Sequence, residues 1–277
     1  MRIGIVGTEN SHAEGVVRYL NIDRRFPDHR VTALADGPAD RNRQLADLGG
    51  IATVAEQSRD LIGTVDAVIV CARDGRRHRD QTLPLLSAAV PVFVDKPFAC
   101  DVADARTMLA AAARHDVAIS SFSALRWTTQ VTTLAGQIGD GMRTVAVSGP
   151  ADPASEHGGL HFYGVHVVEI ALALVSGHPL ECITVADCDD AVVATARAGE
   201  TDVLLEFVKP RDGQVIPWRV ATTGAHGSTV QQLRLTPDYD LPALDIVLRM
   251  FENGRRPLPD RQLLAAVAAL VAIAGGC

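Results

Sequence analysis

An acid, a lysine and a proline follow directly on a short apolar stretch, Val92–Val94, near the middle of the chain's first half. Three apolar residues, two of them β-branched, predict a buried strand. Pro97 cannot donate a ladder hydrogen bond and disfavours helical geometry at Lys96, so the strand ends there. Asp95 and Lys96 are therefore expected at the carboxyl end of a strand, where open α/β sheets bind ligands. A lysine there could stabilise negative charge that develops on a substrate oxygen.

Three histidines and two glutamates lie within a second short span, residues 156–169. His157 and His161 would share a helical face if a helix began early, and such a pair would suit a metal ion. Gly158 and Gly159 lie between them and argue against a helix at that point, so we predict no metal site. His166 carries an imidazole whose ordinary pKa of about 6.5 suits proton transfer near neutrality. The competing interpretation is a packed core histidine.

The first half of the chain alternates apolar stretches with amphipathic ones. Ser11, with Glu14 three residues later, predicts a capping box at the first helix. Repeated alternation of strand and helix predicts a parallel, doubly wound sheet. We expect strands at residues 2–6, 31–35, 65–71, 92–94 and 117–121, and helices at about 12–20, 78–89 and 101–115.

The turn after the first strand is where a dinucleotide would bind in such a sheet. It reads Gly7-Thr8-Glu9-Asn10-Ser11-His12, so a glutamate and a histidine occupy the second and third glycine positions of G-x-G-x-x-G. Glu9 adds bulk and negative charge near a phosphate, and a turn that binds nothing is the alternative. Asp36, at the end of the second strand, could hold a ribose and would repel the extra phosphate of NADP. Arg41 and Arg43 could instead receive that phosphate, so NAD is expected and NADP is left open.

The second half has the alternation typical of an antiparallel sheet with one buried face. We expect strands at residues 141–149, 192–196, 202–209, 215–222 and 227–235, and helices at about 161–175, 242–252 and 260–274. The predicted fold class is α/β, with an N-terminal Rossmann domain, residues 1–122, built on a doubly wound parallel sheet. A C-terminal α/β domain, residues 123–277, would carry a mostly antiparallel open sheet, and its last helix could pack back on the first domain.

Composition excludes several classes of partner. The 277 residues carry a formal net charge of −7 and no basic run, which argues against nucleic acid as a partner. No apolar run reaches membrane-spanning length, and the first residues form a strand pattern and not a secretory signal. The five cysteines include no C-x-x-C pair, which fits a reducing compartment. We therefore expect a cytoplasmic protein with a small-molecule substrate.

The segments described above, in this order, resemble the Gfo/Idh/MocA family of NAD(P)-dependent oxidoreductases. The family usually has Glu-Lys-Pro where this chain has Asp95-Lys96-Pro97. The resemblance covers nearly the whole chain and rests on the first strand up to Gly7, Leu34-Ala35-Asp36, residues 65–70, His78, Asp95-Lys96-Pro97, residues 121–127 with Arg126, Gly158-Gly159 and residues 164–169.

The resemblance implies that Lys96 and His166 are catalytic, with Lys96 touching cofactor and substrate and His166 acting as acid and base for a hydroxyl. Family enzymes commonly place an aspartate four residues before this histidine, where this chain has Phe162. Tyr163 or His161 would have to replace it at the substrate. The implied cofactor-binding residues are Gly7, Thr8, Asn10, Ser11, Asp36, Arg41, Cys71, Ala72, Arg73, His78, Asp95, Lys96 and Arg126.

We therefore expect an NAD(P)-dependent oxidoreductase that acts on a hydroxyl, carbonyl or imine of a small sugar-like or specialised metabolite. The resemblance also implies a homo-oligomer, a dimer or a tetramer. Two non-redox alternatives stay open, because the glycine motif and the aspartate are missing. One is a metabolite-binding or regulatory subunit, and the other is a lyase or isomerase that uses Lys96 and His166 for proton transfer.

Overall fold

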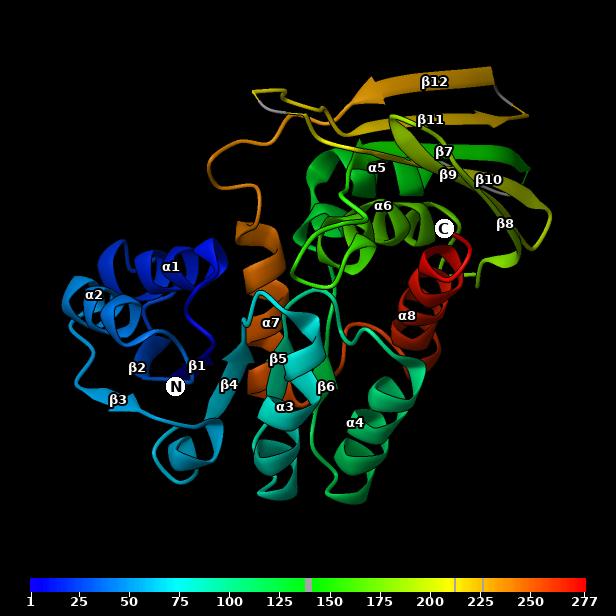
Figure 1. The fold of residues 1–277 in the computed structure, drawn as a ribbon. Coiled ribbons are helices and arrows are strands. Elements are labelled where there is room, and N and C mark those ends of the chain that lie inside the picture. The colour runs from blue at the N-terminus through cyan, green and yellow to red at the C-terminus, as the bar shows by residue number, and fades with distance from the viewer. Residues whose placement is uncertain (138–140, 212, 226) are drawn as a thin grey trace. The chain divides into compact units, whose positions relative to one another are not determined.

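Figure 1 shows the computed structural model, which describes residues 1–137, 141–211, 213–225 and 227–277. The chain divides into two compact units, and each is described by itself. The first unit comprises Met1–Ala99, Ala103–Ser121 and Leu244–Leu258. The second unit comprises Cys100–Val102, Phe122–Ala243 and Pro259–Cys277.

The first unit is built on a six-stranded sheet in the order β3-β2-β1-β4-β5-β6, with every neighbouring pair parallel. The predicted Rossmann sheet is confirmed. The strand order reverses between β1 and β4, which is the switch point where doubly wound sheets bind ligands. All four residues of β4 are buried, as in parallel strands covered on both faces. The strands are β1 (Arg2–Val6), β2 (Arg30–Ala35), β3 (Thr53–Ala55), β4 (Ala67–Val70), β5 (Val92–Val94) and β6 (Ile119–Ser120).

Helices connect these strands, and a late helix, α7, contributes its residues from Leu244 onward to the same unit. The predicted helix at residues 12–20 is divided into an α-helix and a π-helical turn. The helical elements are α1 (Ser11–Val17), η1 (Arg18–Ile22), α2 (Ala39–Gly49), η2 (Ser58–Leu61), η3 (Gly75–Arg77), α3 (His78–Ser87), α4 (Val102–Arg114) and α7 (Leu241–Asn253).

The capping box predicted at Ser11 is wrong, because the cap lies one residue earlier. Asn10 has extended backbone geometry, and its side-chain oxygen accepts a hydrogen bond from the His12 N–H at 3.1 Å. Ser11 is the first helical residue. The Asn10 side chain also donates to Asp95 at 3.3 Å, so a long-range contact favours this residue as the cap over the serine.

The second unit contains a six-stranded sheet in the order β12-β11-β7-β10-β9-β8. Only β7 and β10 run parallel, so the predicted mostly antiparallel sheet is confirmed. The strand predicted at 215–222 begins only at Arg219, and β8 has no counterpart among the predicted strands. The strands are β7 (Met142–Pro150), β8 (Glu181–Asp187), β9 (Ala191–Ala198), β10 (Thr201–Val208), β11 (Arg219–Gly224) and β12 (Gly227–Gln232).

One face of this sheet packs on helices, and the other faces outward. Figure 1 shows α5 and α6 on the inner face, where α6 lies across β7 and β10. The core there is formed by buried residues of α6, α8 and the inner face, among them Phe207 and Leu205. The helical elements of this unit are η4 (Ala124–Trp127), α5 (Thr129–Gln137), α6 (Leu160–Leu174) and α8 (Asp260–Ala274).

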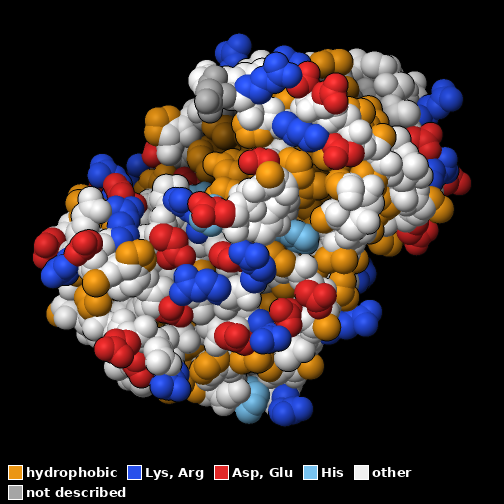
Figure 2. Space-filling view, viewed as in Figure 1, with side chains coloured by type: hydrophobic (Ala, Val, Ile, Leu, Met, Phe, Trp, Pro, Cys, Tyr) orange, Lys and Arg blue, Asp and Glu red, His pale blue; other side chains and the backbone are white. Residues whose placement is uncertain are grey.

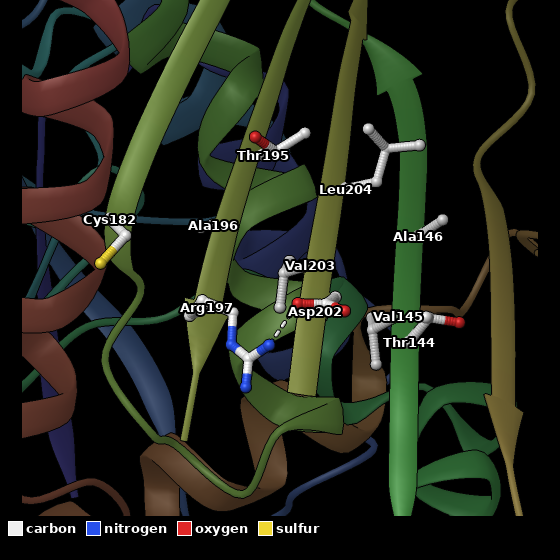
Figure 3. Close-up of a pocket in the computed structure, with 10 residues that line it drawn as sticks. All are labelled: Thr144, Val145, Ala146, Cys182, Thr195, Ala196, Arg197, Asp202, Val203 and Leu204. Atoms are coloured by element: carbon white, nitrogen blue, oxygen red, sulfur yellow. Dashed lines mark hydrogen bonds and ion pairs between the residues drawn. The ribbon is translucent and has the colours of Figure 1, made fainter. Parts of the chain in front are cut away.

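The outward face carries a shallow pocket over β7, β9 and β10, shown in Figure 3. Thr195 and Leu204 stand on this face, and Arg197 pairs with Asp202 at 2.8 Å across neighbouring strands. Figure 2 shows cationic and anionic side chains intermingled over the visible surface. No single sign of charge dominates that surface.

Candidate active site

The carboxyl end of β5 presents a buried ionic cluster in the first unit. Asp95 and Lys96 are only 7% and 4% exposed. The Asp95 carboxylate accepts from His12 Nδ1 at 2.8 Å and from Asn10 at 3.3 Å. Burial acts to raise the pKa of Asp95, but the neighbouring His12 and Lys96 outweigh it and hold that pKa well below its usual range. Asp95 is therefore a fixed negative charge beside the lysine.

Burial lowers the pKa of the Lys96 ammonium, and Asp95 opposes this shift. The backbone after Lys96 is held by His78, which is fully buried. Its two ring nitrogens lie 2.7 Å from the Pro97 carbonyl oxygen and 2.9 Å from the Ala72 carbonyl oxygen. His78 therefore joins the loops that follow β4 and β5, and it positions Lys96 through the backbone. Its predicted contact with a cofactor stays a prediction.

The turn after β1 contains one glycine that the backbone requires. Gly7 has φ +79°, and a Cβ there would lie 2.5 Å from the Ala72 backbone nitrogen. The Glu9 carboxylate is hydrogen-bonded within the unit. Its carboxylate accepts from the Arg73 N–H at 3.3 Å and from Arg77 at 3.1 Å, and its carbonyl accepts from the Arg73 side chain at 3.0 Å.

Asp36, at the end of β2, also contacts Arg77. One Asp36 oxygen accepts from Arg77 at 2.7 Å and the other accepts from Gln81 at 2.9 Å. Sequence reasoning missed Arg77 and Gln81 as site residues, because they lie 41 and 45 positions away from Asp36. The available signal was the run of arginines in segment 73–79, which places several cations after the predicted strand at residues 65–71.

Arg41 is fully engaged within the first unit. It donates to the Thr8 carbonyl at 3.2 Å, to Glu14 at 2.7 Å and to Gln44 at 2.6 Å. The Thr8 hydroxyl in turn donates to Asn42 at 2.6 Å. These contacts fix α2 against the turn after β1, and the predicted contact of Arg41 with a cofactor stays a prediction.

This edge of the sheet fits a nicotinamide dinucleotide in two respects. Gly7, with φ +79°, allows the tight turn after β1, which is the role of the first glycine in dinucleotide-binding turns. The Arg77 guanidinium donates to the carboxylates of both Glu9 and Asp36, which offsets part of their negative charge where a pyrophosphate would bind. The predicted neighbours Cys71 and Ala72 follow β4 at the same edge and are buried.

In the second unit, α6 presents His166 among aromatic rings. Its Nδ1 lies 2.6 Å from the hydroxyl oxygen of Ser123, which also accepts from the Leu125 N–H at 3.2 Å. The rings of Tyr163 and Trp218 meet the His166 ring edge-to-face, with centroids 5.6 and 5.2 Å away. These contacts fix the orientation of the imidazole.

One turn along α6, Glu169 forms a buried ion pair with Arg126 at 2.9 Å. Arg126 also donates to Gln262 of α8 at 2.9 Å. Burial raises the pKa of Glu169, and Arg126 opposes this shift. Arg126 is thus a structural link between η4, α6 and α8, and its predicted contact with a cofactor stays a prediction.

The residues proposed to replace the missing aspartate differ in exposure. His161 is buried, its Nδ1 lies 3.2 Å from the Gly158 carbonyl oxygen, and burial lowers its pKa. Tyr163 is 43% exposed. Phe162 packs edge-to-face on His157 and Tyr163. Of the two candidates, Tyr163 is therefore the one that a substrate could reach.

Lys96 belongs to the first unit and His166 to the second, so the structure describes each within its own unit. Among the described residues, no group of three or more His, Cys, Asp or Glu is arranged to hold a metal ion. Within the same part of the chain, no helix has both the length and the apolar character to cross a membrane.

Comparison with known proteins supports an oxidoreductase. Residues 1–122 match a model described as an oxidoreductase family with an NAD-binding Rossmann fold. An inositol 2-dehydrogenase of Cereibacter sphaeroides is 33% identical over 114 residues, which are 40% of this chain and 32% of that enzyme. A 1,5-anhydro-D-fructose reductase of Ensifer adhaerens is 30% identical over 127 residues, which are 45% of this chain and 37% of that enzyme. The matches thus span only about a third of the length of these relatives.

Solved structures show the same fold over the whole chain. A scyllo-inositol dehydrogenase of Lactobacillus casei with NAD(H) and scyllo-inositol has a TM-score of 0.85 at 15% identity, with 100% of this chain and 96% of that chain covered. An oxidoreductase of Agrobacterium radiobacter in complex with NAD+, L-tartaric acid and magnesium has a TM-score of 0.75 at 16% identity, with the same coverage. At these sequence identities, the two structural similarities show a shared fold and nothing more.

Proposed function

We propose that the chain is an oxidoreductase of the Gfo/Idh/MocA family, whose model matches residues 1–122, and that it oxidises or reduces a small polyol or sugar with a nicotinamide cofactor. The observation that carries this proposal is the cluster at the end of β5. There a buried lysine lies beside an ionised aspartate, at the ligand-binding edge of a Rossmann sheet.

Lys96 would stabilise negative charge on the substrate oxygen. Its side chain is buried, and charges interact more strongly where water is excluded. His12 and Asn10 hold Asp95, and His78 holds the loop, so the lysine needs little reorganisation during the reaction. A bound nicotinamide would supply the hydride acceptor or donor.

His166 would take the hydroxyl proton during oxidation and return it during reduction. Ser123 occupies its Nδ1, so the transfer would use Nε2. Tyr163, exposed and in ring contact with His166, would bind the substrate hydroxyl in place of the aspartate absent at Phe162. The relatives named for inositols and for 1,5-anhydro-D-fructose make cyclic polyols the first substrates to test.

We further propose that the outward face of the second sheet pairs with a second copy of the chain. One row across this face runs through Val230, Ala221, Ala146, Leu204 and Thr195, as the strand registers show. Val230 is 79% exposed and Leu204 is 42% exposed, so the row offers apolar area to a partner. A cytoplasmic location remains a prediction from the cysteine pattern.

The test is calorimetric titration of nucleotide-free protein with NADH and NADPH, followed by assays with inositols and sugars that monitor nicotinamide absorbance. We expect micromolar binding of NADH. We also expect that Lys96→Ala and His166→Ala each lower kcat by about 10²–10⁴, the usual contribution of a positioned proton donor or electrostatic group. If neither nucleotide binds at millimolar concentration, the oxidoreductase proposal is wrong.

A non-redox function is the second candidate, and one observation favours it. Phe162 lies where the redox enzymes of the family commonly have an aspartate. Under this alternative the fold would bind a metabolite as a regulatory subunit, or Lys96 and His166 would catalyse a lyase or isomerase reaction. Turnover of a sugar without any change in nicotinamide absorbance would select the lyase or isomerase.

A further inference from the structure

We infer that Arg77 is the residue that determines whether this protein accepts NAD or NADP. Arg77 could bind the 2′-phosphate of NADP, but its charge is neutralised by Asp36 and Glu9. The inference rests on the proposed nucleotide binding and extends it to cofactor selectivity. It concerns a residue between β4 and α3, and not the segment after β2 that the sequence pointed to.

Arg77 lies on η3 and bridges two carboxylates that belong to different turns. Its Nη1 is 3.1 Å from Glu9, and its Nη2 is 2.7 Å from Asp36. The Arg77 side chain is 45% exposed, so solvent and ligands can reach it. Gln81, one turn into α3, donates to the second Asp36 oxygen at 2.9 Å. Two donors thus converge on the carboxylate that would face the ribose.

The other arginines of this edge are engaged elsewhere in the described part of the chain. Arg41 uses its donors on Thr8, Glu14 and Gln44. Arg43 pairs with Asp40 on an exposed surface of α2. Arg76, next to Arg77 in sequence, donates to the Asp74 carboxylate through its Nε and Nη2 atoms. Asp36 is contacted by Arg77 alone among the arginines, so the two arginines predicted to receive the phosphate are not the best candidates.

Charge explains why the present arrangement favours NAD. One guanidinium shared by two carboxylates leaves a local charge of about −1, which repels a phosphate carrying about −1.5 to −2 charges. A ribose diol is neutral, and Asp36 can accept its hydroxyl protons in exchange for Arg77 and Gln81. The NAD ribose is therefore accepted where the 2′-phosphate is refused.

Removing the Asp36 carboxylate changes both the local charge and the hydrogen bonding of Arg77 and Gln81. The local charge rises to about zero, and Arg77 Nη2 and Gln81 Nε2 lose their common acceptor. A phosphate placed there would satisfy both donors, and arginine binds phosphate with good geometry. The loss of one carboxylate should thus convert Arg77 from a neutralised bridge into a phosphate ligand.

The test compares the affinities of NADH and NADPH, measured by calorimetry, for the wild type, Asp36→Ser and the double variant Asp36→Ser/Arg77→Gln. Asp36→Ser should bind NADPH at least about 10-fold more tightly than the wild type, since a charged hydrogen bond contributes about 1.5–3 kcal/mol. The double variant should lose that gain. Asp36→Ser/Arg76→Gln is the matched control and should keep it, because Arg76 contacts Asp74 and not Asp36.

Asp36 has φ +57°, so serine there carries some backbone strain, and Asp36→Gly is the second variant that avoids it. The inference is overturned if NADPH affinity fails to rise in both variants, or if the rise survives Arg77→Gln. Wild-type binding of NADH in such an experiment would leave the proposed function intact. Binding of neither nucleotide to any variant would refute the proposed function, and the inference with it.

Discussion

Asp95 in the first unit and Glu169 in the second are both buried carboxylates that face cations, yet their pKa values move in opposite directions. Burial acts to raise both. At Asp95, the contacts with His12 and Lys96 outweigh burial and the pKa falls, whereas at Glu169 burial outweighs Arg126 and the pKa rises. The number and placement of the surrounding cations therefore decide the direction.

The difference follows from where each carboxylate lies. Asp95 lies at the carboxyl end of β5, where Asn10 and His12, at the start of α1 and more than 80 positions away in sequence, both contact its carboxylate. Glu169 lies inside α6, which is buried nearly all round, and its ion pair comes from a single arginine. An ionised carboxylate at the sheet edge is stabilised as part of a polar site. The Glu169 carboxylate in the buried helix carries a large desolvation cost, and its main role is to fix η4 against α6.

The largest expected effect is the loss of Arg126. Arg126→Ala leaves Glu169 buried without its ion-pair partner, and such losses cost about 3–5 kcal/mol of unfolding free energy. Urea denaturation at neutral pH measures the change. The double variant Arg126→Met/Glu169→Met is the control and should recover most of the loss, because buried pairs replaced by apolar residues are often near neutral. A loss below about 1 kcal/mol in Arg126→Ala would contradict the assignment of this pair as a core link.

A smaller effect is expected at the sheet edge. His12→Ala removes one of the donors to Asp95 but leaves Asn10 and the neighbouring Lys96, so we expect a loss of about 1–3 kcal/mol. The pKa of Asp95 should also rise toward its ordinary value, which carboxyl NMR titration would show. His115→Ala, at a half-buried position just after α4, is the matched histidine control and should change neither quantity. An unchanged Asp95 pKa in His12→Ala would mean that Lys96 alone sets it.

The contributions of the two carboxylates to stability should depend on pH in opposite directions. Because the folded pKa of Asp95 is lowered, its contribution is present above its unfolded pKa of about 3.9 and is lost as the pH falls below that value. Because the folded pKa of Glu169 is raised, its contribution is present below about pH 4.3 and is lost as the pH rises through the raised value.

Asp95→Asn and Glu169→Gln test this sign directly. The stability deficit of Asp95→Asn should shrink as the pH falls below about 4. Glu169→Gln should match the wild type at low pH and gain on it with rising pH, by about 1.4 kcal/mol for each unit that separates the folded and unfolded pKa values. Denaturation series between pH 3 and 7 measure both differences. If the stability difference from the wild type changed in the same direction with pH in both variants, the opposite pKa shifts of Asp95 and Glu169 would be contradicted.

The two regions also differ in how far the sequence predicted them. The strand at 92–94 and the placement of Asp95 and Lys96 at its end depend on local signals, a β-branched triplet followed by proline, and the structure confirms both. The parallel order of the first sheet followed from alternation of strands and helices. The capping residue was missed, because Asn10 is selected by its contact with Asp95, 85 positions away.

Long-range ion pairs and irregular strands limited the rest. The sequence predicts Glu9 as a barrier to phosphate, because nothing local indicates that Arg77, 68 positions away, pairs with its carboxylate. Strand β8 escaped prediction because Cys182, with φ +53°, interrupts its pairing, and the strand is mostly exposed with no clear alternation. Segment 215–218 has a strand-like composition, yet Val215 is 91% exposed, and within the described residues the strand pairing of β11 begins only at Arg219.

The smallest expected effect concerns the hydroxyl that orients His166. Ser123→Ala removes a neutral hydrogen bond at 2.6 Å and also the cap of the turn at Leu125, so we expect about 1 kcal/mol in stability. If His166 transfers the proton, kcat should fall about 5–10-fold while KM stays nearly constant, since only the orientation of the imidazole changes. Ser123→Thr keeps the hydroxyl and should restore most of the activity. Within the described part of the chain, the buried hydroxyl of Ser120 contacts no polar partner, so Ser120→Ala tests whether loss of any buried hydroxyl has this effect. Equal falls in kcat for Ser120→Ala and Ser123→Ala would show that loss of the hydrogen bond to His166 is not the cause.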